Sequence, residues 1–276
     1  MSLEDKGTAE KVRNWWSTEI IDMRPGKIRI RGENIEDLIG NISFGQMIWL
    51  MIQGRLPEVE EARLLEAALV ASVDHGPQAP AIATARMTVS CGNSLNHALA
   101  SAVNMLGDVH GGAGEQCLEL MQKVKFLLDK GENLEASVAK EIVKHLQTQG
   151  KFIPGFGHRF HKPEDPRAPR LIELVSKAEG EKIVSGIFMR IGLEIQRQLS
   201  QRKSPGIAMN IDGATAVIFG ELGFDPPLAR GLFCLSRSVG ILAHAWEQKK
   251  QGGRNKGPTP PEFLWNYTGK NPLKEE

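Results

Sequence analysis

The sequence predicts a compact all-α fold. Apolar residues recur at spacings of three and four through most of the 276-residue chain, which is the pattern of amphipathic helices. Hydrophobic residues make up 41% of the chain, enough for a substantial core. No repeat of fixed longer period is visible, so a solenoid is not indicated.

The first predicted element is a short β ribbon. Ile28 and Ile30 alternate with basic residues over 26–31, and the preceding Arg-Pro-Gly closes a turn. Outside this ribbon the pattern is helical throughout. Further helices are predicted over 94–106, 112–130, 134–148, 167–178, 181–199 and 226–250.

A helical hairpin is predicted between the ribbon and these helices. Ser43 can cap a helix over 44–53, and Gly54 suits its C-terminal end. Pro57 suits the first turn of a second helix that reaches about Val73. Proline and alanine then interrupt the pattern at 78–81, where a boundary could lie.

Composition restricts the classes of partner. The 34 Lys and Arg residues against 33 Asp and Glu give a formal charge of +1, so nothing drives the chain toward nucleic acid or an anionic membrane. Three cysteines without C-x-x-C spacing indicate neither a disulfide framework nor a zinc site. The N-terminus is charged and no apolar stretch is long enough to span a membrane. We expect a cytoplasmic protein.

Three acid/base residues lie beside glycines and are the best candidates for chemistry. They are His110 in Gly-Asp-Val-His-Gly-Gly-Ala, His158 in Pro-Gly-Phe-Gly-His-Arg, and Asp212 in Asn-Ile-Asp-Gly-Ala. Histidine and aspartate are readily tuned for proton transfer, and glycine lets the backbone approach a ligand closely. Together they suggest proton transfer at carbon, with Asp212 as a base for the α-proton of a thioester.

Each of these patterns also fits a simpler role. His110 could lie on a flexible connector, His158 in a structural loop, and Asp212 at a helix N-cap. The glycines near His158 do not follow a predicted strand, so a dinucleotide-binding fingerprint is weak. His158 and His161 have no third ligand at a suitable spacing, so no metal site is predicted.

Several basic residues could bind a polycarboxylate. Arg167 lies at a predicted helix start, Arg237 within Leu-Ser-Arg-Ser-Val-Gly, and Arg254 after two glycines. Guanidinium groups bind carboxylates through two parallel hydrogen bonds. His75 follows an apolar helix, where the simpler interpretation is an interaction with the helix dipole.

In this order, the motifs resemble the citrate synthase superfamily. The resemblance extends from about Thr18 to Arg254 and is carried by residues 24–32, 35–39, 74–75, 110–113, 155–158 with 165–167, 210–212 and 236–240. It implies a citrate synthase-like fold with a reduced large domain and a short N-terminal β ribbon. A single unit over 1–276 is expected, with 1–106 and 226–276 forming the large, dimer-forming part and 107–225 the small catalytic part.

The resemblance also implies a role for each candidate residue. The position of Asp212 acts on the acetyl-CoA methyl group, that of His110 stabilises the enol, and that of His158 exchanges a proton with the dicarboxylate oxygen. Positions matching His75, Arg167, Arg237 and Arg254 hold carboxylates, the last from the neighbouring subunit. The segment Ile153, Pro154, Gly155, Phe156 and Gly157 matches the passage of coenzyme A.

Size decides which relatives are favoured. A single predicted helix joins Gly54 to Asp74, whereas full-length citrate synthases carry many more helices there. The chain therefore looks closer to citryl-CoA lyase and to the citrate synthase-like module of ATP-citrate lyase. The implied reaction is retro-Claisen cleavage of citryl-CoA, or a similar 3-hydroxy-3-carboxyacyl-CoA, to acetyl-CoA and oxaloacetate.

Two alternatives stay open at this point. One is a short citrate or 2-methylcitrate synthase, because synthase and lyase use the same three residues. The other is a non-catalytic subunit that binds coenzyme A thioesters within a larger complex. A homodimer or tetramer is expected, with an activating partner subunit as a further option. No tightly bound cofactor is expected, since coenzyme A is part of the substrate.

Overall fold

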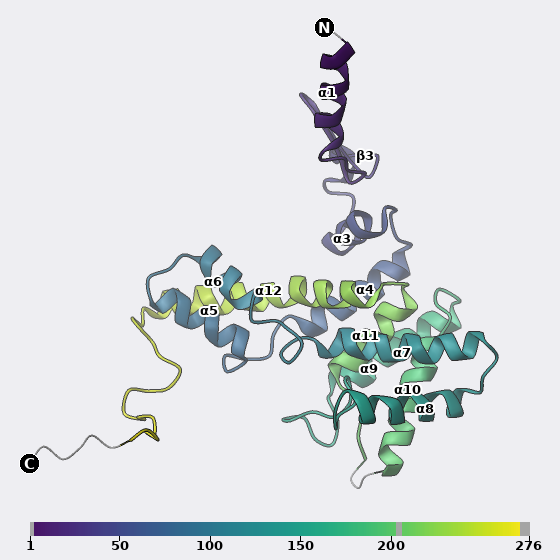
Figure 1. The fold of residues 1–276 in the computed structure, drawn as a ribbon, viewed down its shortest axis with the longest axis vertical. Coiled ribbons are helices and arrows are strands. Elements are labelled where there is room, and N and C mark those ends of the chain that lie inside the picture. Colours follow the sequence, from purple (N-terminus) through teal and green to yellow (C-terminus); the bar gives the residue numbers. More distant parts are fainter. Residues whose placement is uncertain (1–2, 203–205, 271–276) are drawn as a thin grey trace, which may run out of the picture.

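Helices dominate the regular structure of the computed structural model, which describes residues 3–202 and 206–270 (Figure 1). The predicted all-α class is confirmed. The helices are α1 (Leu3–Asn14), α2 (Ile35–Leu38), α3 (Phe44–Gln53), α4 (Val59–Ser72), α5 (Pro80–Ser90), α6 (Leu95–Val103), α7 (Ala113–Asp129), α8 (Leu134–Thr148), α9 (Arg167–Gly180), α10 (Ile187–Arg202), α11 (Ile211–Glu221) and α12 (Pro226–Gln251).

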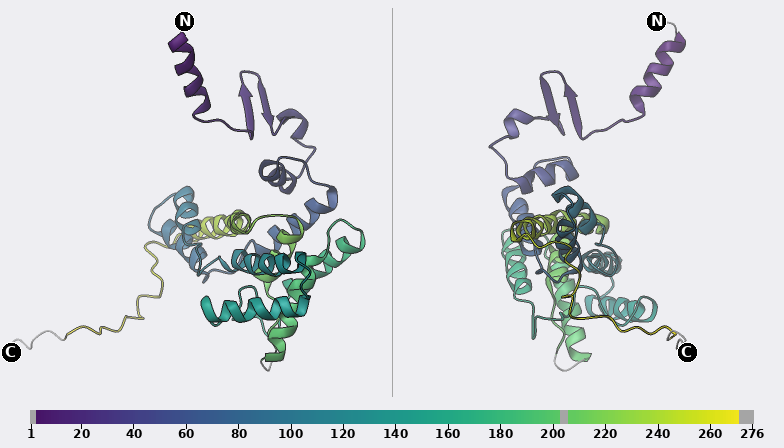
Figure 2. Two further views of the ribbon diagram at one scale, coloured as in Figure 1. Left: turned by 45° about the vertical axis from the view of Figure 1, so that its right-hand side comes forward. Right: turned by 90° about the vertical axis from the view of Figure 1, so that its left-hand side faces the viewer.

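The predicted ribbon is present as part of a small antiparallel sheet. Its strands are β1 (Ile21–Arg24), β2 (Lys27–Ile30) and β3 (Glu33–Asn34), paired in the order β1-β2-β3. Arg24 pairs with Lys27, so Pro25 and Gly26 form the turn, and Gly26 has a φ of 74°. The sheet and α1 extend away from the helical body (Figures 1 and 2). Helix α1 was not predicted.

The helical hairpin follows the prediction closely. The Ser43 hydroxyl accepts from the Gln46 amide, and the Gln46 side chain accepts from the Ser43 amide, which forms a capping box at the start of α3. Gly54 ends α3 in the left-handed conformation, with its amide donating to the Leu50 carbonyl. Local sequence chemistry is sufficient to set both ends of this helix.

The interruption of the helical pattern near 78–81 is present, whereas one predicted helix start is wrong. Residues 73–79 are not helical, and Pro80 then starts α5, where no backbone donor is needed. Helix α10 begins at Ile187 and not at 181, after a turn in which Lys182 and Gly186 have positive φ. The Glu221 carboxylate, from α11, accepts the Phe188 and Met189 amides and thereby caps α10.

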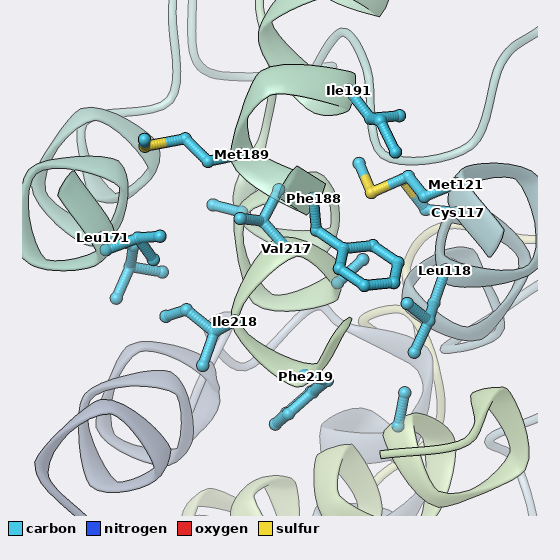
Figure 3. Close-up of a cluster of buried hydrophobic side chains, with 14 of the residues drawn as sticks. Cys117, Leu118, Met121, Leu171, Phe188, Met189, Ile191, Val217, Ile218 and Phe219 are labelled. Atoms are coloured by element: carbon cyan, nitrogen blue, oxygen red, sulfur yellow. The ribbon is translucent and has the colours of Figure 1, made fainter. Parts of the chain in front are cut away.

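The larger of two hydrophobic clusters surrounds α11. Residues 213–220 of this helix are all buried, and α4, α7, α9 and α10 pack around it. Figure 3 shows Val217 and Ile218 among side chains of the neighbouring helices. Because residues 213–220 of α11 are buried, Asp212 in its first turn is the carboxylate of this helix that lies beside the N-terminal end.

A smaller cluster lies between α5, α6 and α12, with Ile82, Ala98 and Ile241 fully buried. Helix α12 is long enough to contact both clusters, since it packs on α4 and α7 as well as on α5 and α6. Within the described ranges no helix is long and apolar enough to cross a membrane.

Candidate active site

The first turn of α11 presents Asp212. The N-cap of this helix is Asn210, whose side-chain oxygen accepts from the amides of Asp212, at 2.9 Å, and Gly213, at 3.3 Å. The simpler interpretation of Asp212 as the N-cap is therefore wrong. With capping done by Asn210, the Asp212 carboxylate is not needed for the backbone of this helix.

The loop over 153–157 is fastened to the segment before α11. The Gly157 amide donates to the Ala208 carbonyl, at 2.8 Å, and the Asn210 amide donates to the Gly155 carbonyl, at 3.0 Å. The Asn210 side-chain amide also donates to the Gly157 carbonyl, at 2.6 Å. Asn210 thus joins the helix that carries Asp212 to the loop that leads into His158.

Glycine at 155 serves packing. Gly155 has a φ of +85°, and a Cβ there would lie 2.5 Å from Cys117 Sγ and 2.8 Å from Gly213 Cα. Ile153, Gly155 and Phe156 are buried, whereas Gly157 is exposed. Contact of the five-residue loop with coenzyme A stays a prediction, and Pro154 and Gly157 are its accessible parts.

His158 has a defined tautomer when neutral. Its Nδ1 accepts from the backbone amides of Phe160, at 3.1 Å, and His161, at 3.0 Å. The ring proton then lies on Nε2. Burial lowers the pKa of His158; the Asp165 carboxylate offsets part of this effect, and the charges of His161 and Arg167 add to it. His158 is therefore a neutral imidazole that can donate from Nε2.

His75 and His161 flank this ring. The ring centroids of His75 and His158 are 5.4 Å apart, edge to face, and those of His158 and His161 are 4.5 Å apart. Burial lowers the pKa of His75, and the nearby Arg237 and Arg167 lower it further. The exposed ring of Phe160 lies 6.3 Å from both His75 and His158.

His110 lies on the turn between α6 and α7, as predicted. Its Nε2 accepts from the Ala81 amide, at 3.3 Å, in the first turn of α5. The proton of the neutral ring consequently lies on Nδ1. Burial lowers the pKa of His110, and the charge of Arg237 adds to this effect. Like His158, this histidine is set up as a neutral hydrogen-bond donor.

The His110 turn is held from two sides. Arg230, on α12, forms an ion pair with Asp108 at 2.7 Å and another with Glu115. The Gln116 side chain donates to the Asp108 carbonyl, at 3.0 Å. These contacts fix the loop to both α7 and α12.

Arg237 is the most buried cation of the group, with 6% exposure. Its Nε donates to the Ser72 carbonyl, at 3.0 Å, and its guanidinium lies 4.8 Å from the Phe233 ring centroid. Burial lowers the pKa of Arg237, while Asp74 and Asp212 act in the opposite direction. A buried guanidinium requires an anionic partner.

Burial also shifts the pKa of Asp212. It raises the pKa of this carboxyl, and the charges of Arg167 and Arg237 oppose the rise without cancelling it. A carboxyl whose pKa is raised holds a proton more readily than an exposed carboxyl and can act in acid/base chemistry. The structure thus gathers Asp212, Arg167 and Arg237 within electrostatic range of one another.

Arg254 is the predicted site residue that the protomer does not bring to this group. Arg254 follows the C-terminal end of α12. At 1.5 Å per residue, that end of the helix lies about 21 Å from Arg237. There it lines a separate cavity of about 380 Å³ with Ser90, Cys91 and Gln248. A contribution from a neighbouring subunit stays a prediction.

Asp165 is a residue for which sequence reasoning gave no role. Its carboxylate is fully buried between Arg167 and the start of α11. Burial tends to raise its pKa, but the Arg167 guanidinium and backbone amides outweigh this and hold the pKa at about 2. The signal available in the sequence was its position two residues before Arg167, at the start of a helix.

The family model for the C-terminal domain of citrate synthase matches residues 57–258, which contain every one of these residues. The chain belongs to the citrate synthase family. A solved structure, citryl-CoA lyase from Hydrogenobacter thermophilus, matches with 33% identity and a TM-score of 0.81, over 94% of this chain and 97% of that one.

Longer relatives match only in part. Citrate synthase of Acidithiobacillus ferridurans is 29% identical over 213 residues, which are 76% of this chain and 52% of that protein. ATP citrate lyase from Methanothrix soehngenii, solved with citrate and coenzyme A, is 20% identical with a TM-score of 0.78, over 98% of this chain and 45% of that one. The chain thus spans about half the length of these two proteins, and the latter likeness shows the fold alone.

Proposed function

We propose that this protein is a carbon–carbon lyase that cleaves citryl-CoA, or a similar 3-hydroxy-3-carboxyacyl-CoA, to acetyl-CoA and oxaloacetate. The observation that carries the proposal is the end-to-end match to a citryl-CoA lyase, which this chain covers over 97% of its length. The citrate synthase of Acidithiobacillus ferridurans is matched over only 52% of its length. The arrangement of the acid/base residues supports the same chemistry.

Asp212 and His110 act on the acetyl part of the substrate. Breaking the carbon–carbon bond leaves an enolate whose oxygen carries developing negative charge. The Nδ1 proton of His110 stabilises that oxygen, because a preoriented donor is most effective where charge develops. Asp212, whose raised pKa favours its protonated form, gives its proton to the carbon.

His158 acts on the hydroxyl group. It must take the hydroxyl proton at Nε2, so the ring proton must first lie on Nδ1. The backbone amides of Phe160 and His161 then have to turn away from Nδ1, which they face in this structure. Solvent afterwards carries the proton from His158 back to Asp212, which balances the cycle.

His75, Arg167 and Arg237 bind the carboxylates of the substrate. Arg237 supplies a buried cation, and Arg167 lies close enough to act on the pKa of Asp212 and His75. Pro154 and Gly157, the accessible part of the 153–157 loop, contact the coenzyme A part. No further group is needed for the proton transfers described.

The experiment is a product assay with citryl-CoA. Cleavage gives acetyl-CoA and oxaloacetate, whereas hydrolysis gives citrate and free coenzyme A and would identify a citrate synthase instead. Binding of coenzyme A without turnover, together with copurification of a second protein, would identify a non-catalytic subunit.

The Asp212→Asn variant tests the assignment of the acid. Turnover should fall about 10²- to 10⁴-fold, the range expected for one acid/base group, while binding of coenzyme A is retained. Activity close to that of the wild type would refute the role of Asp212.

A homodimer formed through α12 completes the proposal. Leu235, Val239, Leu242 and Trp246 lie on one face of α12 and are 41–60% exposed. No charged residue is among the exposed positions from Gly231 to Trp246, which is unusual for a helix facing solvent.

The spacing of these four residues favours a second copy as the partner. The four residues are separated by four, three and four positions, so the pattern is symmetric about the point midway between Val239 and Leu242. Two antiparallel α12 helices related by a two-fold axis would pair Leu235 with Trp246, and Val239 with Leu242. With the same axis, the C-terminal end of α12 in one copy, which leads to Arg254, lies level with Arg230 in the other copy. That Arg230 holds the His110 turn of its own copy.

The test is the mass in solution of the Val239→Glu variant, measured by light scattering. The wild type should be a dimer or larger, and the variant should dissociate. Val143→Glu is the matched control, because Val143 is 44% exposed on α8, away from this face. A monomeric wild type, or equal masses for all three proteins, would refute the interface.

A further inference from the structure

We infer that Asp165 is a positioning residue that holds the carboxylate-binding Arg167 and the helix of Asp212 in a single geometry. The inference rests on the proposed function and extends it to a residue outside the predicted site. Asp165 is 1% exposed, and its side chain is completely buried.

Asp165 first orients Arg167. Its two carboxylate oxygens accept from Arg167 Nε, at 2.9 Å, and Nη2, at 2.8 Å, and one of them also accepts the Arg167 amide, at 3.2 Å. Arg167 Nη1 donates to the Ala71 carbonyl, at 3.4 Å. A guanidinium has five N–H groups, so one on each terminal nitrogen is left for a substrate carboxylate. The plane of the guanidinium is fixed before any substrate arrives.

Asp165 also holds the start of α11. The carboxylate oxygen that receives Arg167 Nη2 accepts the Ile211 amide as well, at 3.1 Å. Ile211 is the first residue of α11 and directly precedes Asp212. One oxygen atom therefore ties the group that binds the substrate to the helix that carries the acid.

This geometry has an electrostatic consequence. The charges acting on Asp212 come from Arg167 on α9, Arg237 on α12 and Asp165 itself, and the buried thiol of Cys117 on α7 lies nearby. The negative charge of Asp165 raises the pKa of Asp212, and it also neutralises part of the opposing charge of Arg167. Removing it lowers the pKa of Asp212 by both routes.

The experiment compares the wild type with Asp165→Asn in two measurements. Calorimetric titration with oxaloacetate should show affinity weakened about 10- to 100-fold, since a misdirected guanidinium loses its paired hydrogen bonds. In the pH profile of kcat/KM, the limb belonging to Asp212 should move to lower pH. The limb should move to lower pH whether cleavage or condensation is assayed, because the ionisation of the same carboxyl, Asp212, sets the limb in both directions of the reaction.

Two further variants make the result specific. Glu141→Gln removes another nearly buried carboxylate, on α8, and should change neither measurement. Asp165→Glu keeps the charge but lengthens the arm, so it should weaken oxaloacetate binding and leave the pH limb close to that of the wild type. This variant also serves if Asp165→Asn does not fold.

The outcomes separate the two proposals. Loss of activity in Asp165→Asn with unchanged oxaloacetate affinity and an unmoved pH limb would reduce Asp165 to a structural role and overturn the inference. A wild type that cleaves no hydroxyacyl-CoA overturns the proposed function, but weaker oxaloacetate binding by Asp165→Asn would still support the positioning of Arg167.

Discussion

Replacing Gly155 with alanine should both destabilise the protein and impair the site. The new methyl group would lie 2.5 Å from Cys117 Sγ and 2.8 Å from Gly213 Cα, closer than nonbonded carbon atoms are found. Gly213 follows Asp212 directly, so relieving the contact moves the helix that carries the carboxylate.

The magnitude has two parts. A φ of +85° costs a residue other than glycine about 1–2 kcal/mol. Overpacking in a close-packed interior costs about 1–3 kcal/mol more. With an unfolding entropy of about 2.1 cal/mol/K per residue, a loss of about 2–5 kcal/mol lowers the Tm of this chain by about 3–9 °C.

Thermal unfolding followed by circular dichroism measures the loss, with Gly131→Ala as the matched control. Gly131 has nearly the same φ, +87°, but an added methyl group there meets no atom within 4 Å. This control should lower the Tm by only about 2–3 °C, from the backbone cost alone.

Equal losses of Tm for the two alanine variants would refute the packing argument. A second check uses Cys117→Ala in the Gly155→Ala background. Removing the sulfur should recover part of the lost stability, while the contact with Gly213 keeps the remainder. No recovery would show that the sulfur is not the obstacle.

Three other outcomes are expected. Asn210→Ala should cost about 1–2 kcal/mol in unfolding free energy, because the cap of α11 and the bond to the Gly157 carbonyl are both lost, and kcat should fall with it. Glu221→Gln should cost about 1 kcal/mol, measured by chemical denaturation, because a carboxylate that caps α10 loses its charge. The pKa of Asp165 is lowered from 3.8 to about 2. The ionised Asp165 carboxylate therefore contributes about 2 kcal/mol to the free energy of unfolding above pH 3.8, and this contribution is lost as the pH falls through 2. The difference in unfolding free energy between the wild type and Asp165→Asn should narrow over that interval, and a constant difference would contradict the assignment.

Local chemistry made the hairpin predictable. The bounds of α3 depend on Ser43 and Gly54, whose effects act within one turn of the helix. The start of α10 was not predictable in this way. Its cap, Glu221, lies more than 30 residues away in sequence and reaches the helix only after α11 has packed against it.

The candidate site, like the helix ends, has features that follow from local sequence and features that depend on distant residues. Glycine-rich surroundings and residue type were enough to propose His110, His158 and Asp212 as candidates, because acid/base capacity and backbone freedom are properties of individual residues and their neighbours. The sequence also determined the all-α class, through the helical period of its apolar residues.

Only the tertiary structure decided the protonation pattern and the partners of these residues. The tautomer of His110 depends on the Ala81 amide, 29 positions earlier, and the geometry of Asp212 depends on Asp165, 46 positions before the Ile211 amide that it holds. Such hydrogen bonds and the burial that shifts each pKa arise when distant segments pack together, so no local pattern in the sequence contains them.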